Sequence, residues 1–218
     1  MRARQISREL ALLALSQLPS SPERLAKQEL YNLVLAAVRT LTTEAHEALE
    51  TAAMELDRGY QQLLKSETQA AHVESAQVMV RAAIEQVQVA LNRLGAAIDF
   101  PERIQLANQT NVRAYALEIL ECLNAHRAEI DQLLEASLVD WQIQRLVRVD
   151  RDLLRIATTE MLYLGTPERV AINEAVELAK LYGDEEGHRF INGVLRRVVD
   201  QLQSRPPVGG VPTVTGDT

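Results

Sequence analysis

Three kinds of side chain in this sequence could perform chemistry: histidines near carboxylates, a single cysteine, and arginines close to the N-terminus. His46 and the glutamate after it begin like a zinc-protease motif, but the position of the second histidine holds Glu50. Cys122 lies between leucines in a helical pattern, which favours a packing thiol over a reactive one. The sequence also lacks glycine-rich phosphate loops and the G-x-S-x-G nucleophile motif. We therefore expect no catalytic residue, no metal and no cofactor.

A second candidate metal site is the stretch GDEEGH, in which Glu185, Glu186 and His188 carry suitable donor atoms. The spacing favours a simpler interpretation, in which Gly183 ends one helix in a left-handed conformation and Asp184 caps the next. The two glutamates would then lie in the first turn of that helix, against the positive end of its dipole.

The arginines suggest phosphate binding. The chain has a net charge of −7, and acidic residues outnumber basic ones between positions 9 and 140. Arg2, Arg4 and Arg8 nevertheless precede every acidic residue of the chain, so they form a local basic cluster. Guanidinium groups bind phosphate oxygens in pairs, which indicates a surface for nucleic acid.

Phe190 is a residue that the helix pattern leaves unexplained. It follows His188 and Arg189 and lies off the apolar stripe of its helix.

These residues must be positioned by helices, because no stretch alternates polar and apolar residues as a strand would. Two series with a spacing of seven residues predict paired helices, namely Leu49, Leu56 and Leu63, then Val73 to Leu94. With a turn at residues 65–68 they form an antiparallel hairpin within the chain; a dimerising coiled coil is the alternative. The sequence predicts an all-α protein.

The location of the protein follows from further absences in the sequence. No apolar run approaches the roughly 20 residues that cross a membrane, and the basic start lacks the apolar stretch of a signal peptide. One cysteine cannot form an internal disulfide, as is usual in a reducing compartment. We expect a cytoplasmic protein without membrane contact.

Three segments resemble a known family. "VDRDLLRIATTEML", "VAINEAVELAKLYG" and "HRFINGVLRRV" are similar to the C-terminal signature of the NusB family of bacterial transcription antitermination factors, and "RARQISRELALLALSQL" is similar to its N-terminal opening. The resemblance implies two helical subdomains, residues 1–140 and 141–205, followed by a disordered tail at 206–218. Residues of about 36–100 exceed the usual family length, so the hairpin would be an insert.

The resemblance also implies a function: binding of boxA-type single-stranded RNA from ribosomal RNA leaders together with NusE, within the antitermination complex of RNA polymerase. Arg2, Arg4, Arg8, Arg189 and Phe190 match RNA-facing positions of the family. At Phe190 two interpretations remain open: the ring stacks on an unpaired base or lines the RNA surface, or it completes the core face of its helix. Asp150 and Glu186 match acidic positions at the surface for RNA or NusE.

One departure from the family pattern is Ser16, which stands where family members usually carry tyrosine. Two other functions stay open: a helical interaction scaffold with weakened RNA binding, and an accessory domain related to those that precede rRNA methyltransferase domains.

Overall fold

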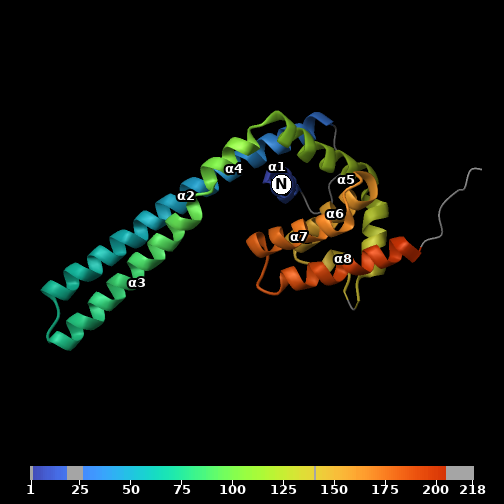
Figure 1. The fold of residues 1–218 in the computed structure, drawn as a ribbon. Coiled ribbons are helices and arrows are strands. Elements are labelled where there is room, and N and C mark those ends of the chain that lie inside the picture. Colours follow the sequence, from blue (N-terminus) through green and yellow to red (C-terminus); the bar gives the residue numbers. More distant parts are fainter. Residues whose placement is uncertain (1, 19–26, 140, 205–218) are drawn as a thin grey trace, which may run out of the picture.

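The computed structural model describes residues 2–18, 27–139 and 141–204, and these form helices without a strand. The helices are α1 (Arg2–Ser16), α2 (Lys27–Thr68), α3 (Val73–Ala97), α4 (Phe100–Ala107), α5 (Thr110–Ser137), the short 3₁₀ helix η1 (Ile143–Arg145), α6 (Arg148–Tyr163), α7 (Glu168–Tyr182) and α8 (Gly187–Ser204). The predicted all-α class is confirmed. Figure 1 shows a helical body from which one long pair of helices projects.

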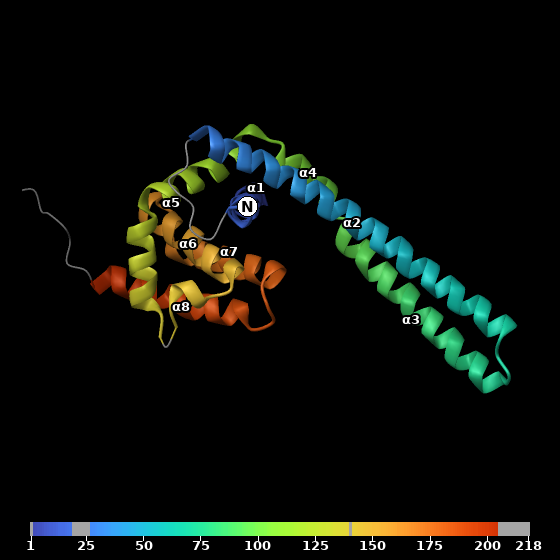
Figure 2. The same cartoon turned by 180° about the vertical axis from the view of Figure 1, so that it is seen from behind.

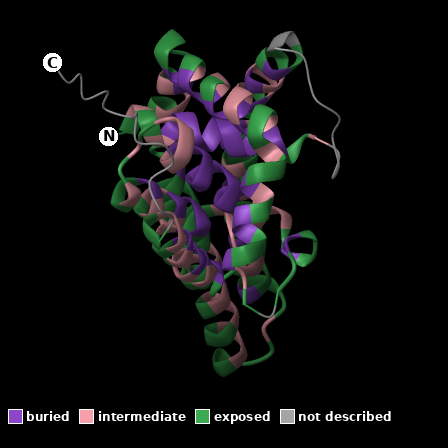
Figure 3. Ribbon diagram, turned by 90° about the vertical axis from the view of Figure 1, so that its right-hand side faces the viewer, coloured by how far each residue is buried: buried purple, intermediate pink, exposed green. Residues whose placement is uncertain are grey.

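The first helix lies in the centre of the body. Every residue of α1 from Ile6 to Leu15 is buried. The helix is buried on all sides because α2, α4, α5 and α6 surround it, and its buried charged residues, such as Arg8, must therefore find partners inside the body. Figure 3 shows the buried segments gathered in the middle of the body, where side chains of α1 and α5 to α8 form one hydrophobic cluster. That cluster includes residues from both predicted subdomains.

Two arginines fasten the ends of helices in this body. Arg148 at the start of α6 donates hydrogen bonds to the carbonyls of Leu15, at 2.6 Å, and Leu18. Arg197 of α8 donates to the Ser137 carbonyl at the end of α5, at 2.6 Å. The last carbonyls of a helix lack partners within it, so a cation at this place both bonds them and opposes the negative end of the dipole.

The projecting pair is an antiparallel hairpin of α2 and α3 (Figures 1 and 2). Its seam is built from small buried residues spaced by seven: Ala45, Ala52, Gly59 and Ser66 on α2, and Ala83, Ala90 and Ala97 on α3. A Cβ at Gly59 would lie 3.1 Å from the Ala83 carbonyl oxygen. The absence of a side chain at Gly59 therefore allows the two helices to approach closely.

Several predicted boundaries shift. The hairpin turns at residues 69–72 instead of 65–68, because α2 continues through Thr68. The segment before α5 forms the separate helix α4, and α5 itself bends at His126. The predicted boundary near Asp140 and the tail at 206–218 lie outside the described residues.

Candidate nucleic-acid interface

The start of α8 forms one wall of a pocket of about 270 Å³ on the surface of the body. Phe190 is half-buried at its edge, and the ring of Trp141 lies edge-on to it with 6.5 Å between the ring centroids. We call this site the Trp141–Phe190 pocket. Its lining residues are Trp141, Arg145, Leu146, Val147, Asp150, Asp184, Glu186, Gly187 and Phe190.

Asp150 and Glu186, which were predicted to lie at a binding surface, both line this pocket. Gly187 explains how Asp150 can pack against α8, because a Cβ at that position would lie 3.2 Å from Asp150 Oδ1. Burial, followed by the charge of the Asp184 carboxylate, raises the pKa of the Asp150 carboxyl. Among the described residues Asp150 Oδ1 is buried without a hydrogen-bond donor.

The turn that carries the acids differs from the prediction. Gly183 has φ −99° and ψ −179°, an extended conformation, so the left-handed helix end predicted there is wrong. Helix α8 begins only at Gly187, so Glu185 and Glu186 precede it and do not occupy its first turn. The turn before the helix is closed by a backbone hydrogen bond from Gly187 N–H to the Asp184 carbonyl, at 3.0 Å.

Arg189 is exposed beside this turn. Its guanidinium forms an ion pair with Glu186 at 3.0 Å, and both side chains are more than 70% exposed to solvent. An exposed pair of this kind contributes little to stability, so a phosphate could replace the carboxylate at low cost. Arg189 remains available to a ligand.

Arg8 is not available. Its side chain is 5% exposed, and its guanidinium pairs with Glu160 at 2.8 Å and with Glu174 at 3.2 Å. Tyr115 donates a further hydrogen bond to Glu160 at 2.6 Å. A phosphate could reach Arg8 only if this buried network opened. The structure therefore places Arg8 in the interior, and we do not include it in the interface.

Arg2 and Arg4 do reach the surface of α1. Arg2 forms an ion pair with Glu102 of α4. The guanidinium carbon of Arg4 lies 3.5 Å from the centre of the Tyr115 ring, a cation–π contact that orients the group and leaves the residue exposed. The guanidinium groups of these two arginines are therefore accessible to a phosphate.

The two groups of predicted RNA residues lie at opposite ends of α6. Arg4 contacts Tyr115, which bonds to Glu160, whereas Phe190 belongs to the pocket around Asp150. Ten residues of helix separate Asp150 from Glu160, which corresponds to about 15 Å. Ser16, where the family usually has tyrosine, is exposed and its hydroxyl donates to the Leu13 carbonyl at 2.7 Å.

The sequence interpretation missed Trp141. The side chain is 57% exposed, an unusual position for the only tryptophan of a chain. The sequence did contain a signal for this residue. Trp141 is the only tryptophan of the chain, it falls between two helices, and it belongs to no apolar stripe. Arg145, also exposed and lining the pocket, was missed as well.

Two searches of the described residues bear on other kinds of site. Within the described ranges, no cluster of three or more histidine, cysteine or acidic side chains has a geometry that could hold a metal ion. No helix there is both long and apolar enough to cross a membrane.

In the described residues, the protein is an all-helical body around a buried central helix, with an aromatic pocket beside exposed arginines. Comparison with known proteins identifies the family. The model of the NusB family matches residues 74–200. "Transcription antitermination protein NusB" of Microcystis aeruginosa is 58% identical over 199 residues, covering 91% of this chain and 92% of that protein. Its counterpart in a Cyanothece species is 58% identical over 205 residues, covering 94% and 98%. The chain belongs to the NusB family.

The solved structure of NusB from T. maritima is 29% identical in sequence, with a TM-score of 0.42 over 51% of this chain and 82% of that one. The cyanobacterial relatives are matched over nearly their whole length, so they share most of the hairpin segment with this chain. The family match also includes nearly all of α3. That residues 36–100 are an insert relative to the usual family length stays a prediction.

Proposed function

We propose that this protein binds boxA-type single-stranded RNA together with NusE, and that the Trp141–Phe190 pocket receives an unpaired base. The observation that carries the proposal is the pair of aromatic rings, one of them 57% exposed, at a pocket of about 270 Å³ with arginines at its border. An aromatic ring stacks on a base of any type, at about 1–3 kcal/mol for each base.

The charges around the pocket support a division of roles. Asp150, Asp184 and Glu186 would repel a phosphate placed inside, so the pocket suits a base and not the backbone of the RNA. A carboxylate there accepts a hydrogen bond from a base amino group, or from a cationic side chain of NusE. Arg145 and Arg189 lie where phosphates on either side of the base would meet them.

The arginines of α1 extend this surface. Arg4 contacts Tyr115, which bonds to Glu160, and Glu160 lies about 15 Å along α6 from Asp150 in the pocket. A single strand of RNA that contacted both places would run across the body from one end of α6 to the other. The proposed RNA path therefore begins at α1 and ends at the start of α8.

The test is binding of a short boxA RNA, measured by fluorescence anisotropy at several salt concentrations, with and without NusE. Trp141→Ala should weaken binding by about 5- to 150-fold, the equivalent of 1–3 kcal/mol. Arg4→Ala should weaken it less and reduce the salt slope by about one phosphate contact. Phe190→Ala tests the same pocket but also removes a side chain that packs against the core, so it should lower Tm as well.

Tyr31→Ala is the matched control, because this aromatic residue is also exposed but lies far from the pocket on α2. It should bind as the unaltered protein does. If Trp141→Ala also binds normally, the pocket does not receive a base. If the unaltered protein does not bind boxA RNA even at low salt with NusE present, the chain is a helical scaffold and the proposal is wrong.

A further inference from the structure

One side of the hairpin is apolar from its base almost to its tip. On both helices, exposed and half-buried apolar residues recur every three, four or seven positions beside the small residues of the seam. We call this surface the apolar face; its residues are Leu49, Leu56, Tyr60 and Leu63 of α2, Val80, Ile84, Val87, Leu91 and Leu94 of α3, and Ile98 directly after α3. Leu56, Tyr60 and Leu91 are 53%, 57% and 60% exposed.

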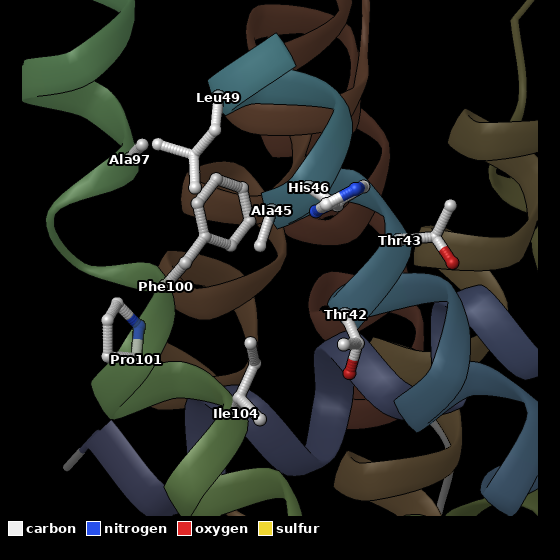
Figure 4. A pocket seen from close by; sticks show the side chains of 9 residues that line it. All are labelled: Thr42, Thr43, Ala45, His46, Leu49, Ala97, Phe100, Pro101 and Ile104. Carbon is white, nitrogen blue, oxygen red and sulfur yellow. The ribbon is translucent and has the colours of Figure 1, made fainter.

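The face is also hollowed to receive side chains. A groove of about 320 Å³ lies between the helices at mid-length, lined by Leu56, Gly59, Tyr60, Leu63, Val80, Ala83, Ile84, Val87 and Gln88. No charged side chain lines it. At the base of the hairpin a second hollow of about 570 Å³ includes Leu49 and Phe100, whose side chains point toward one another in Figure 4.

A face of this kind is costly to leave in water. Monomeric proteins seldom expose a continuous apolar surface of more than a few hundred Å², and such a surface marks an interaction site. Two helices alone bury only the seam between them, whereas a second pair placed on the face would complete a four-helix bundle.

We propose that the apolar face binds the same face of a second copy of this chain, so that two hairpins form an antiparallel four-helix bundle. This inference does not rest on RNA binding. The groove at the centre of the face has no charged lining residue with which to select a charged partner, and an uncharged apolar surface can complement itself. Tyr60 and Ile84, at mid-length on the two helices, would lie near the centre of the interface.

The size of the face is sufficient. The stripe on α3 from Val80 to Ile98 is about 27 Å long, and two adjacent helices are about 20 Å wide. Each copy would thus cover about 500 Å², and both together about 1,000 Å², the lower limit of a specific interface. An interface of this size predicts a dimer that dissociates on dilution, with dissociation in the micromolar range.

The dimer would leave the Trp141–Phe190 pocket open, because that pocket lies on the body and the hairpin projects away from it (Figures 1 and 2). Two copies joined through their hairpins would carry two such pockets. Each copy would bind its ligand independently of the other.

The test is sedimentation velocity of the full chain over a dilution series. We expect a mass that rises from 24.3 kDa toward twice that value as concentration increases. Leu56→Glu should abolish the rise, because it places a charge in the interface. Met54→Glu is the matched control: Met54 lies on the same helix and is also 53% exposed, but it is two positions from Leu56, which turns it by about 200° around the helix, away from the apolar face. It should dimerise normally.

Tyr60→Ala is the second variant, since it removes an exposed ring and leaves the hairpin seam intact; it should weaken the dimer at least about tenfold. Circular dichroism should show unchanged helix content in all three variants. A chain that stays at 24.3 kDa at every concentration overturns the proposal. The proposal is also overturned if Leu56→Glu and Tyr60→Ala form a dimer as stable as that of Met54→Glu, because the dimer interface would then lie elsewhere.

Discussion

The body and the hairpin pack their helices by different means. In the body, buried charges join helices that are distant in sequence: Arg8 of α1 pairs with Glu160 of α6, and Arg155 of α6 holds both carboxylate oxygens of Asp131 on α5, at 2.7 and 2.8 Å. In the hairpin, small residues form the seam. Polar side chains there bond locally, as Ser66 does to the Leu63 carbonyl at 2.6 Å.

The difference explains where a binding site can be built. Ion pairs with hydrogen bonds fix the distance and the rotation of each helix, and a buried charge that loses its partner is costly. A site on the body, such as the Trp141–Phe190 pocket, therefore has a rigid support. The seam of alanines and glycine fixes only how closely the helices approach. The hairpin therefore offers a continuous apolar face whose groove is not fixed by buried charges.

The largest test of this comparison removes a charge from the body. Arg8→Ala leaves Glu160 buried and partly unpaired, so we expect a loss of about 3–5 kcal/mol in the free energy of unfolding. For a chain of this size, that lowers Tm by about 10 °C. Thermal unfolding followed by circular dichroism measures it.

Arg189→Ala is the control for Arg8, because it breaks an ion pair of the same type at the surface. It should change the free energy of unfolding by less than about 1 kcal/mol. If Arg8→Ala melts like the unaltered protein but loses RNA affinity, then Arg8 belongs to the interface and the buried network does not stabilise the body.

A smaller effect is expected in the hairpin. Gly59→Leu must separate α2 from α3, since even a Cβ would lie 3.1 Å from the Ala83 carbonyl and 3.3 Å from Gln86 Cβ. Overpacking of this kind costs about 1–3 kcal/mol. Hydrogen exchange should become faster in α2 and α3 while α6 keeps its protection, because the hairpin projects away from the body.

Gly95→Leu is the matched variant. Gly95 also lies in the hairpin, but a Cβ there would meet no atom within 4 Å. This change should leave exchange unaltered or slow it slightly, since leucine favours the helix more than glycine does. Equal effects of the two substitutions would show that close approach at Gly59 does not hold the hairpin together.

The hairpin was predictable from sequence because its pattern is local. Spacing by seven in Leu49, Leu56 and Leu63 identifies a helix and the side of it that is apolar, and the turn follows within a few residues of its predicted place. What the pattern left open was whether a second chain or the same chain supplies the partner helix. The structure shows that α3 supplies it.

The burial of Arg8 could not be predicted in this way, because its ion-pair partners Glu160 and Glu174 lie more than 150 residues further along the chain. Only the unbroken apolar run from Leu10 to Leu15 signalled that α1 is covered on all sides. The predicted end of α7 was also wrong. Glycine after a helix usually adopts the left-handed conformation, but Gly183 continues into the turn with an extended backbone.

The smallest expected effect concerns Asp150, which belongs to the body through α6 and also lines the Trp141–Phe190 pocket. Burial and the nearby Asp184 carboxylate raise the pKa of Asp150. A carboxyl whose pKa is higher in the folded protein than in the unfolded chain holds its proton more tightly when folded, so stability falls as pH rises from the ordinary value of 3.8 through the raised one.

Asp150→Asn removes that loss, because the amide carries no charge at any of these pH values. We expect Tm at neutral pH to rise by less than about 3 °C, and the difference from the unaltered protein to vanish as the pH falls to about 4 or below. If the difference in Tm between the variant and the unaltered protein is the same at acid and neutral pH, then burial under Gly187 does not raise the pKa of Asp150.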